Sequence, residues 1–144
     1  MSRRLEQSFH TRELEQLARQ LAMSPRKRQI QQVRRAEKLH DEIDPAKTYP
    51  FDFLAYRITA YRDESGEDAM LVGEAIRPDL RLMIDRLSRQ AGMPEGDEPT
   101  VDPETLADEK NVSTKTVLRW RKSGLRWRWE KPEVGGRHRL VICR

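Results

Sequence analysis

Apolar residues recur every three or four positions through the first part of the chain, the spacing that places them on one face of an α-helix. A first helix is predicted after Thr11, whose side chain suits an N-cap. A second is predicted after Ser24 as N-cap, with Pro25 at the first helical position. The apolar faces of these two helices are formed by Leu14, Leu17, Ala18, Leu21 and Ala22, and by Ile30, Val33, Ala36, Leu39 and Ile43.

Two further stretches before residue 92 carry the same period. A helix is predicted after Pro50, although a strand remains an alternative for this aromatic stretch, whose alternation is imperfect. Another helix is predicted after Pro78, with Gly92 as its stop. Their apolar faces are formed by Phe51, Leu54, Ile58 and Tyr61 in the first and by Leu80, Met83, Ile84 and Leu87 in the second.

The stretch "AGMPEGDEPTVDPE" at residues 91–104 interrupts this periodicity with Gly, Pro and acidic residues, which is typical of a linker. The chain is therefore predicted to divide into a helical domain at 1–92, a linker at 93–101 and a second domain at 102–144. The helical domain would serve in protein interaction or oligomerisation.

The second domain begins with two short helices. Asp102 and Pro103 give an N-cap followed by proline at the first helical position. Asn111 tolerates the left-handed backbone of a tight turn, and Ser113 can cap a second helix over 114–123, which Gly124 ends. The residues placed to fill the crossing of the two helices are Leu106, Ala107, Val112, Val117 and Trp120.

The rest of the chain, "LRWRWEKPEVGGRHRLVIC", alternates apolar and basic residues on both sides of the turn-rich "PEVGG", which predicts a β-hairpin. Leu125, Trp127, Trp129, Leu140 and Ile142 would share the face turned to the helices. The opposite face would show four arginines to solvent: Arg126, Arg128, Arg137 and Arg139. The fold class predicted is thus mainly α, a small helical N-terminal domain plus a C-terminal winged helix-turn-helix with a β-hairpin wing.

The distribution of charge along the chain indicates a class of binding partner. The net charge is only +4, but residues 1–40 and 100–144 have excesses of six and five basic residues, and residues 41–99 an excess of seven acids. Basic ends around an acidic middle favour a polyanionic partner, although solvated helix faces explain the same counts. The segment 111–131 alone holds seven Lys/Arg and all three Trp.

Several classes of protein lack support in the sequence. The single cysteine, Cys143, excludes a disulfide framework, and His10, His40 and His138 lack metal-ligand spacing. There is neither a nucleotide-binding loop nor a catalytic motif. No apolar run is long enough to span a membrane, and no signal peptide is recognisable. We expect a cytoplasmic protein with no enzymatic activity, cofactor, metal or membrane contact.

The motif at 104–125, "ETLADEKNVSTKTVLRWRKSGL", and the later "GRHRLV" resemble the DNA-binding unit of MerR-like regulators and phage excisionase-type proteins. This resemblance covers about residues 102–142. The long dimerising helix that follows the wing in MerR-like regulators has no counterpart here. The whole chain is also, more weakly, similar to the N-terminal module of some bacterial sigma-70-type factors.

The residues and the resemblance together predict a bacterial, nucleoid-associated, sequence-specific regulator of transcription that binds double-stranded DNA. A helix over 113–123 would read the major groove, and the wing would follow the backbone. The alternative is a sigma-like adaptor or protein-interaction module acting with RNA polymerase. Either could use the helical domain to bind RNA polymerase, another protein or a second copy. The candidate DNA contacts are Ser113, Thr114, Lys115, Thr116, Arg119, Lys122, Arg126, Arg128, Arg137 and Arg139.

Overall fold

The computed structural model describes residues 8–62, 69–96, 98–131 and 136–144, and these form six α-helices and two small antiparallel sheets. The mainly α class is therefore confirmed. In chain order the elements are α1 (Arg12–Leu21), α2 (Arg26–Glu42), β1 (Thr48–Pro50), α3 (Phe51–Thr59), β2 (Met70–Val72), α4 (Gly73–Ala91), β3 (Thr100–Val101), α5 (Pro103–Lys110), α6 (Thr114–Trp120), β4 (Trp127–Glu130) and β5 (Arg139–Cys143). A 3-10 turn at Arg121–Ser123 continues α6.

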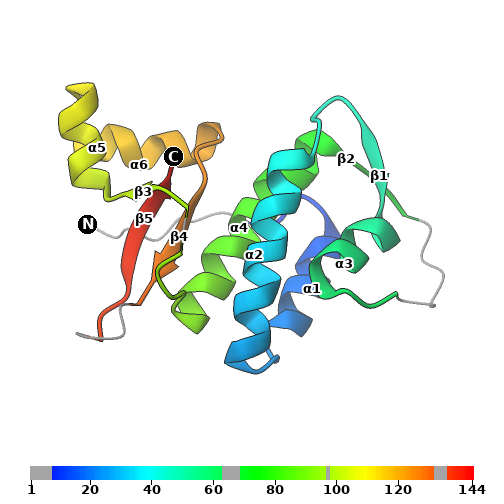
Figure 1. Cartoon of the computed structure of the whole chain (residues 1–144). Helices are drawn as coiled ribbons and strands as arrows, with labels where there is room; N and C mark the ends of the chain where they lie inside the picture. Colours follow the sequence, from blue (N-terminus) through cyan, green and yellow to red (C-terminus); the bar gives the residue numbers. More distant parts are fainter. Residues whose placement is uncertain (1–7, 63–68, 97, 132–135) are drawn as a thin grey trace.

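The first four helices pack around one hydrophobic core, with α2 and α4 side by side and α1 and α3 against them (Figure 1). The apolar stripes predicted from the sequence supply most of this N-terminal core, and Leu14, Val33, Leu54 and Ile84 are fully buried in it. The assignment of Tyr61 to the third stripe is wrong, because α3 ends at Thr59 and Tyr61 is exposed beyond it. The predicted cap at Thr11 is confirmed, since its side chain accepts a hydrogen bond from the Leu14 N–H.

Two helix starts differ from the prediction. The second helix has Pro25, not Ser24, at its N-cap. The fourth begins at Gly73 and carries Pro78 inside it, where a start after Pro78 was expected. Pro78 removes a single hydrogen bond close to the helix start, which limits its cost. Gly73 permits the early start, because a Cβ there would lie 2.0 Å from the carbonyl oxygen of Asp44.

The C-terminal strands form a sheet in the order β3-β5-β4. Trp127 pairs with Ile142 and Trp129 with Leu140, which confirms the two antiparallel strands predicted from the alternation. Most of the "PEVGG" turn lies outside the described residues. The short strands β1 and β2, which pair with each other, and β3, which adds to β5, were not predicted because two or three residues carry no period.

A second hydrophobic cluster, the C-terminal core, joins this sheet to α5 and α6. Its buried members are Val101, Leu106, Ala107, Val117, Trp127, Trp129, Leu140 and Ile142.

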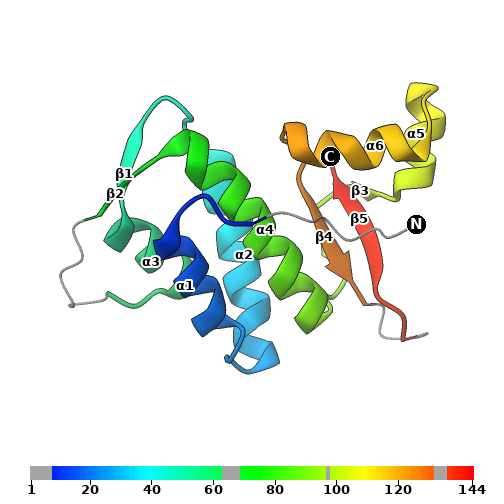
Figure 2. The ribbon, with the colours of Figure 1, turned by 180° about the vertical axis from the view of Figure 1, so that it is seen from behind.

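Strand β4 also lies against α4, and both views show the two elements side by side (Figures 1 and 2). Both indole N–H groups, of Trp127 and Trp129, donate to the same Asp85 carboxylate oxygen, at 2.8 and 2.9 Å. The Trp129 backbone N–H donates to the Ser88 hydroxyl. The C-terminal core is therefore tied to the helical body by buried hydrogen bonds.

The stretch 93–101, predicted as a linker, has defined partners. Met93 is buried, accepts a backbone hydrogen bond from Lys131 and donates one to Trp129. Residues 100–101 form β3. The predicted division into two domains stays a prediction, but the segment between them is bound to the sheet along much of its length.

Candidate nucleic-acid interface

The α5–α6 pair has the local signals that its sequence indicated. Asp102 accepts a hydrogen bond from the Thr105 N–H at 2.7 Å and caps α5, with Pro103 in the first turn. Asn111 ends the helix in the left-handed conformation, at φ 55°. Ser113 then caps α6 by accepting from the Thr116 N–H at 3.2 Å. The result is a helix, a three-residue turn and a second helix.

The inner face of α6 is anchored in the C-terminal core. Val117 is fully buried, and Trp120 is half-buried and packs against the same core. Leu118 is also half-buried against it. A further residue that the sequence reading missed is Arg121, which is buried and lies 5.0 Å over the Trp127 ring. Its place four residues after Val117, on the same helical face, was the available signal.

The outer face of α6 presents cations to solvent. Lys115, Arg119 and Lys122 are exposed, and among the described residues none of them forms an ion pair. Thr114 is half-buried beside them. The Ser113 hydroxyl is engaged with Thr116, whose own hydroxyl lies 2.9 Å away, so these two predicted contacts already serve the helix cap.

The prediction of four solvent-facing arginines on the hairpin is wrong for two of them. Arg126 and Arg128 are buried, with only 9% and 2% of their surface exposed. The predicted alternation of side chains along β4 is correct. However, α2 and the segment around Glu98 cover the face that was predicted to lie in solvent. That face carries a buried ion network, which consists of Glu37, Asp41, Glu98, Arg126, Arg128 and Glu130.

The geometry of this network explains why the two arginines are held inside. Arg126 donates to Glu37 at 2.6 Å and also binds Glu98. Arg128 donates to Glu37 at 3.0 Å, Glu98 at 2.8 Å and Glu130 at 3.0 Å. Each guanidinium therefore has at least two carboxylate partners, which is the condition under which buried charges are tolerated.

Burial and pairing act differently on the carboxylates. Burial raises the pKa of Glu37 above its ordinary value, in spite of the two neighbouring arginines. Burial also acts to raise the pKa of Glu98, but hydrogen bonds from Arg126 and Arg128 outweigh it and hold that pKa below the ordinary value. Glu98 therefore stays charged and keeps the segment before β3 closed over the strand.

Glu37, Glu98 and Cys143 lie close enough together to share a metal ion. The carboxylates of Glu37 and Glu98 already bind the guanidinium groups of Arg126 and Arg128, whose positive charge would repel a cation. Burial raises the pKa of the Cys143 thiol to about 12, so the thiolate that a metal requires is disfavoured. The arrangement favours ion pairing over metal binding.

The network continues into the helical body through His40. Its Nε2 accepts a hydrogen bond from Arg81 at 3.0 Å, so the ring proton sits on Nδ1, 3.1 Å from Asp41. Burial lowers the pKa of His40 to about 4. A neutral imidazole thus links α4 to the carboxylate that meets Arg126.

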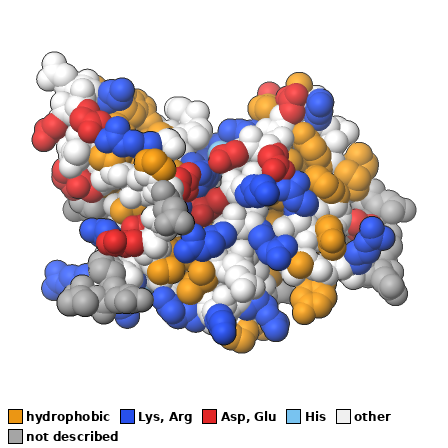
Figure 3. Space-filling view, viewed as in Figure 1, with side chains coloured by type: hydrophobic (Ala, Val, Ile, Leu, Met, Phe, Trp, Pro, Cys, Tyr) orange, Lys and Arg blue, Asp and Glu red, His pale blue; other side chains and the backbone are white. Residues whose placement is uncertain are grey.

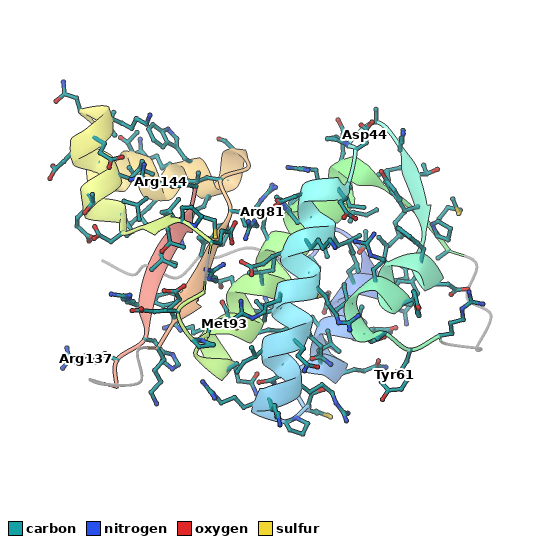
Figure 4. All side chains as sticks on the ribbon, viewed as in Figure 1. Asp44, Tyr61, Arg81, Met93, Arg137 and Arg144 are labelled. Carbon is teal, nitrogen blue, oxygen red and sulfur yellow. The ribbon has the colours of Figure 1, made fainter. Side chains whose placement is uncertain are left out.

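The other two predicted wing residues, Arg137 and Arg139, are exposed. Figure 4 shows Arg137 projecting away from the body of the protein. Arg139 binds Glu95 at 2.8 Å, with both side chains largely in solvent. The exposed candidate contacts are therefore the outer face of α6 and the start of β5, not the full row on the hairpin.

Comparison with known proteins adds no family. No protein-family model, curated protein or solved structure matches this chain. Within the described residues, none of the helices combines the length and the apolar character that crossing a bilayer requires.

Proposed function

We propose that this protein is a sequence-specific regulator of transcription that binds double-stranded DNA and inserts α6 in the major groove. The observation that carries the proposal is the contrast between the two faces of α6. Val117 and Trp120 fix one face to the C-terminal core, whereas Lys115 and Arg119 stand exposed on the other. A rigid helix with free cations on its outer face is suited to contact guanine acceptors and phosphates.

The start of β5 would contribute contacts to the DNA backbone. Arg137 and Arg139 are exposed there and would bind phosphates without reading sequence. Arg126 and Arg128 have a different role in this proposal. They hold β4 against α2 and so set the angle of the hairpin relative to the helical body.

A second candidate, a sigma-like adaptor or other protein-interaction module acting with RNA polymerase, is favoured by one observation. Large apolar side chains are exposed at the end of the helical body that carries α3, β1 and β2, where Figure 3 shows hydrophobic side chains gathered. Exposed apolar patches of this kind mark protein contacts. The residues are Phe53, Tyr56, Tyr61, Met70 and Val72, with exposed fractions of 38% to 68%. In a regulator, the same surface would bind a protein partner.

A selection of genomic fragments on the purified full-length chain tests the leading candidate. We expect enrichment of a discrete site, bound in a fluorescence-anisotropy titration more tightly than a scrambled duplex. Lys115→Ala and Arg119→Ala should each reduce that preference, by about 1–3 kcal/mol if the lost contact is a bidentate one to a base. Lys38→Ala, which removes an exposed cation of α2, is the matched control and should leave the preference unchanged.

The two candidates separate on this result. Failure to enrich any site, with weak binding to all duplexes at low salt, would contradict the regulator and leave the adaptor. A site whose preference survives both α6 substitutions would contradict α6 as the reading helix.

A further inference from the structure

A cleft of about 380 Å³ opens beside the C-terminal sheet, on the far side of β5 from the buried β4 strand. Its lining comes from three places: β3, the start of α5, and β5 with the residue after it. The lining residues are Thr100, Val101, Asp102, Thr105, Arg139, Val141 and Arg144. We call it the β3–β5 cleft.

The cleft is lined by two guanidinium groups and by parts of β3 and β5. Val101 and Val141 are buried. Arg139 and Arg144 come from β5 and from the residue after it, and Figure 4 shows Arg144 beside α5 at the end of β5. The Arg144 backbone N–H donates to the Pro99 carbonyl at 3.1 Å, which anchors the residue at this edge.

Arg144 is held by an exposed carboxylate, and Arg139 by exposed Glu95 and, at the longer distance of 3.8 Å, by buried Glu130. Arg144 binds Glu109 at 2.7 Å, with side chains 46% and 41% exposed, and Arg139 binds Glu95. Exposed pairs of this type contribute about 0–1 kcal/mol, so an incoming phosphate can replace the carboxylate at small cost. Arg126 and Arg128, in contrast, are bound by several buried carboxylates and are not exchangeable in this way.

Asp102, the one acid in the lining, is already engaged. Its carboxylate accepts from the Thr105 N–H at 2.7 Å and from the Thr105 hydroxyl at 3.0 Å. Its negative charge is thereby directed to the start of α5, where it stabilises the helix. The same hydrogen bonds from Thr105 lower the pKa of Asp102 and keep it charged, so the lining carries two cations and one anion.

The geometry points to a phosphodiester segment of a nucleic-acid backbone as the ligand of the β3–β5 cleft. The phosphate oxygens meet Arg139 and Arg144. This inference rests on the proposed function and extends it: the DNA backbone is held at this cleft as well as at α6. A contact of this kind is independent of base sequence.

The test measures duplex affinity of the full-length chain across a range of salt concentrations. Arg144→Gln should weaken binding to selected and scrambled duplexes by the same factor and should reduce the slope of log K against log salt by about one unit. Arg19→Gln, which removes another exposed and ion-paired arginine far from the cleft, is the control and should leave the slope unchanged.

Glu109→Gln provides the opposite perturbation, because it removes the carboxylate that competes for Arg144. Binding should tighten more than in Asp108→Asn, which removes one acid from the same helix without freeing Arg144. Equal tightening in the two variants would overturn the inference.

The outcomes separate the cleft from the proposed function. Absence of duplex binding by the wild-type protein would overturn the function and the cleft together. Wild-type binding with an unchanged slope in Arg144→Gln would overturn the cleft alone. A titration with inorganic pyrophosphate tests the remaining possibility. If the amide signals around Arg144 shift with pyrophosphate but not with duplex, the cleft binds a free phosphate ligand, and its assignment to the nucleic-acid backbone is overturned.

Discussion

Removing Arg128 should destabilise the whole protein, because its side chain serves the fold and not a DNA contact. The guanidinium is 2% exposed and binds Glu37, Glu98 and Glu130, of which Glu37 and Glu130 are themselves buried. Arg128→Met keeps most of the side-chain volume but, among the residues that the structure describes, leaves Glu130 with Arg139 as its one ion-pair partner, at 3.8 Å. Breaking a buried ion pair in this way costs about 3–5 kcal/mol.

The size of the effect can be measured by urea unfolding. With a typical slope of about 2 kcal/mol per molar urea, the loss corresponds to a midpoint lower by about 1.5–2.5 M at unchanged slope. Arg139→Met is the comparison on the same face of the sheet. Its largely exposed pair with Glu95 contributes about 0–1 kcal/mol, so its midpoint should fall by less than about 0.5 M.

The pH dependence of the Arg128→Met variant has a defined sign. Burial already raises the pKa of Glu37 in the wild type, and the charge of Arg128 acts to lower it, so in the variant that pKa lies further above its value in the unfolded chain. The folded state then binds more protons than the unfolded state, so its stability decreases as pH rises through that raised pKa. The deficit relative to wild type should grow between pH 5 and pH 8. A urea midpoint of Arg128→Met equal to that of wild type would refute this reasoning. An equally large decrease of the midpoint in Arg139→Met would refute it as well.

Three further predictions concern the contacts between the helical body and the C-terminal core. Burial lowers the pKa of His40 to about 4, below about 6.5 in the unfolded chain. About 3 kcal/mol of stability should therefore be lost as pH falls through that window, and an urea series should show the loss in wild type but not in His40→Gln. Asp85→Ala leaves two buried indole N–H groups without their acceptor and should cost about 2–4 kcal/mol in the same assay, whereas a cost below about 0.5 kcal/mol would contradict the shared contact. A fragment of residues 100–144 lacks Asp85 and Glu37, so its proton NMR spectrum should show the poor dispersion of an unfolded chain. Well-dispersed indole signals would instead show that its core folds alone.

The elements with local causes could be predicted from the sequence. Thr11, Asp102 and Ser113 cap the helices expected of them, because a cap depends on a side chain and an N–H three residues away. Asn111 takes the left-handed turn for an equally local reason. The strands β4 and β5 followed from their alternation, which also placed Trp127, Trp129, Leu140 and Ile142 on one face.

What could not be predicted depends on segments distant in sequence. Alternation places Arg126 and Arg128 on one face of β4, but it does not show that Glu37, 91 residues from Arg128, will cover that face. The composition of β4 is typical of a DNA-binding wing, but Arg126 and Arg128 are as buried as core residues. Gly73 is a similar case, since its early helix start depends on the close approach of the Asp44 backbone.

Titration of the isotope-labelled full-length protein with its selected duplex, followed by proton–nitrogen NMR, tests the central claim most directly. We expect the largest amide shifts over 113–123, with smaller ones over 137–144, and none at Phe53 or Tyr56 on the exposed apolar surface of α3. Shifts confined to α3, or the absence of shifts from α6 at saturating duplex, would contradict α6 as the DNA-reading helix.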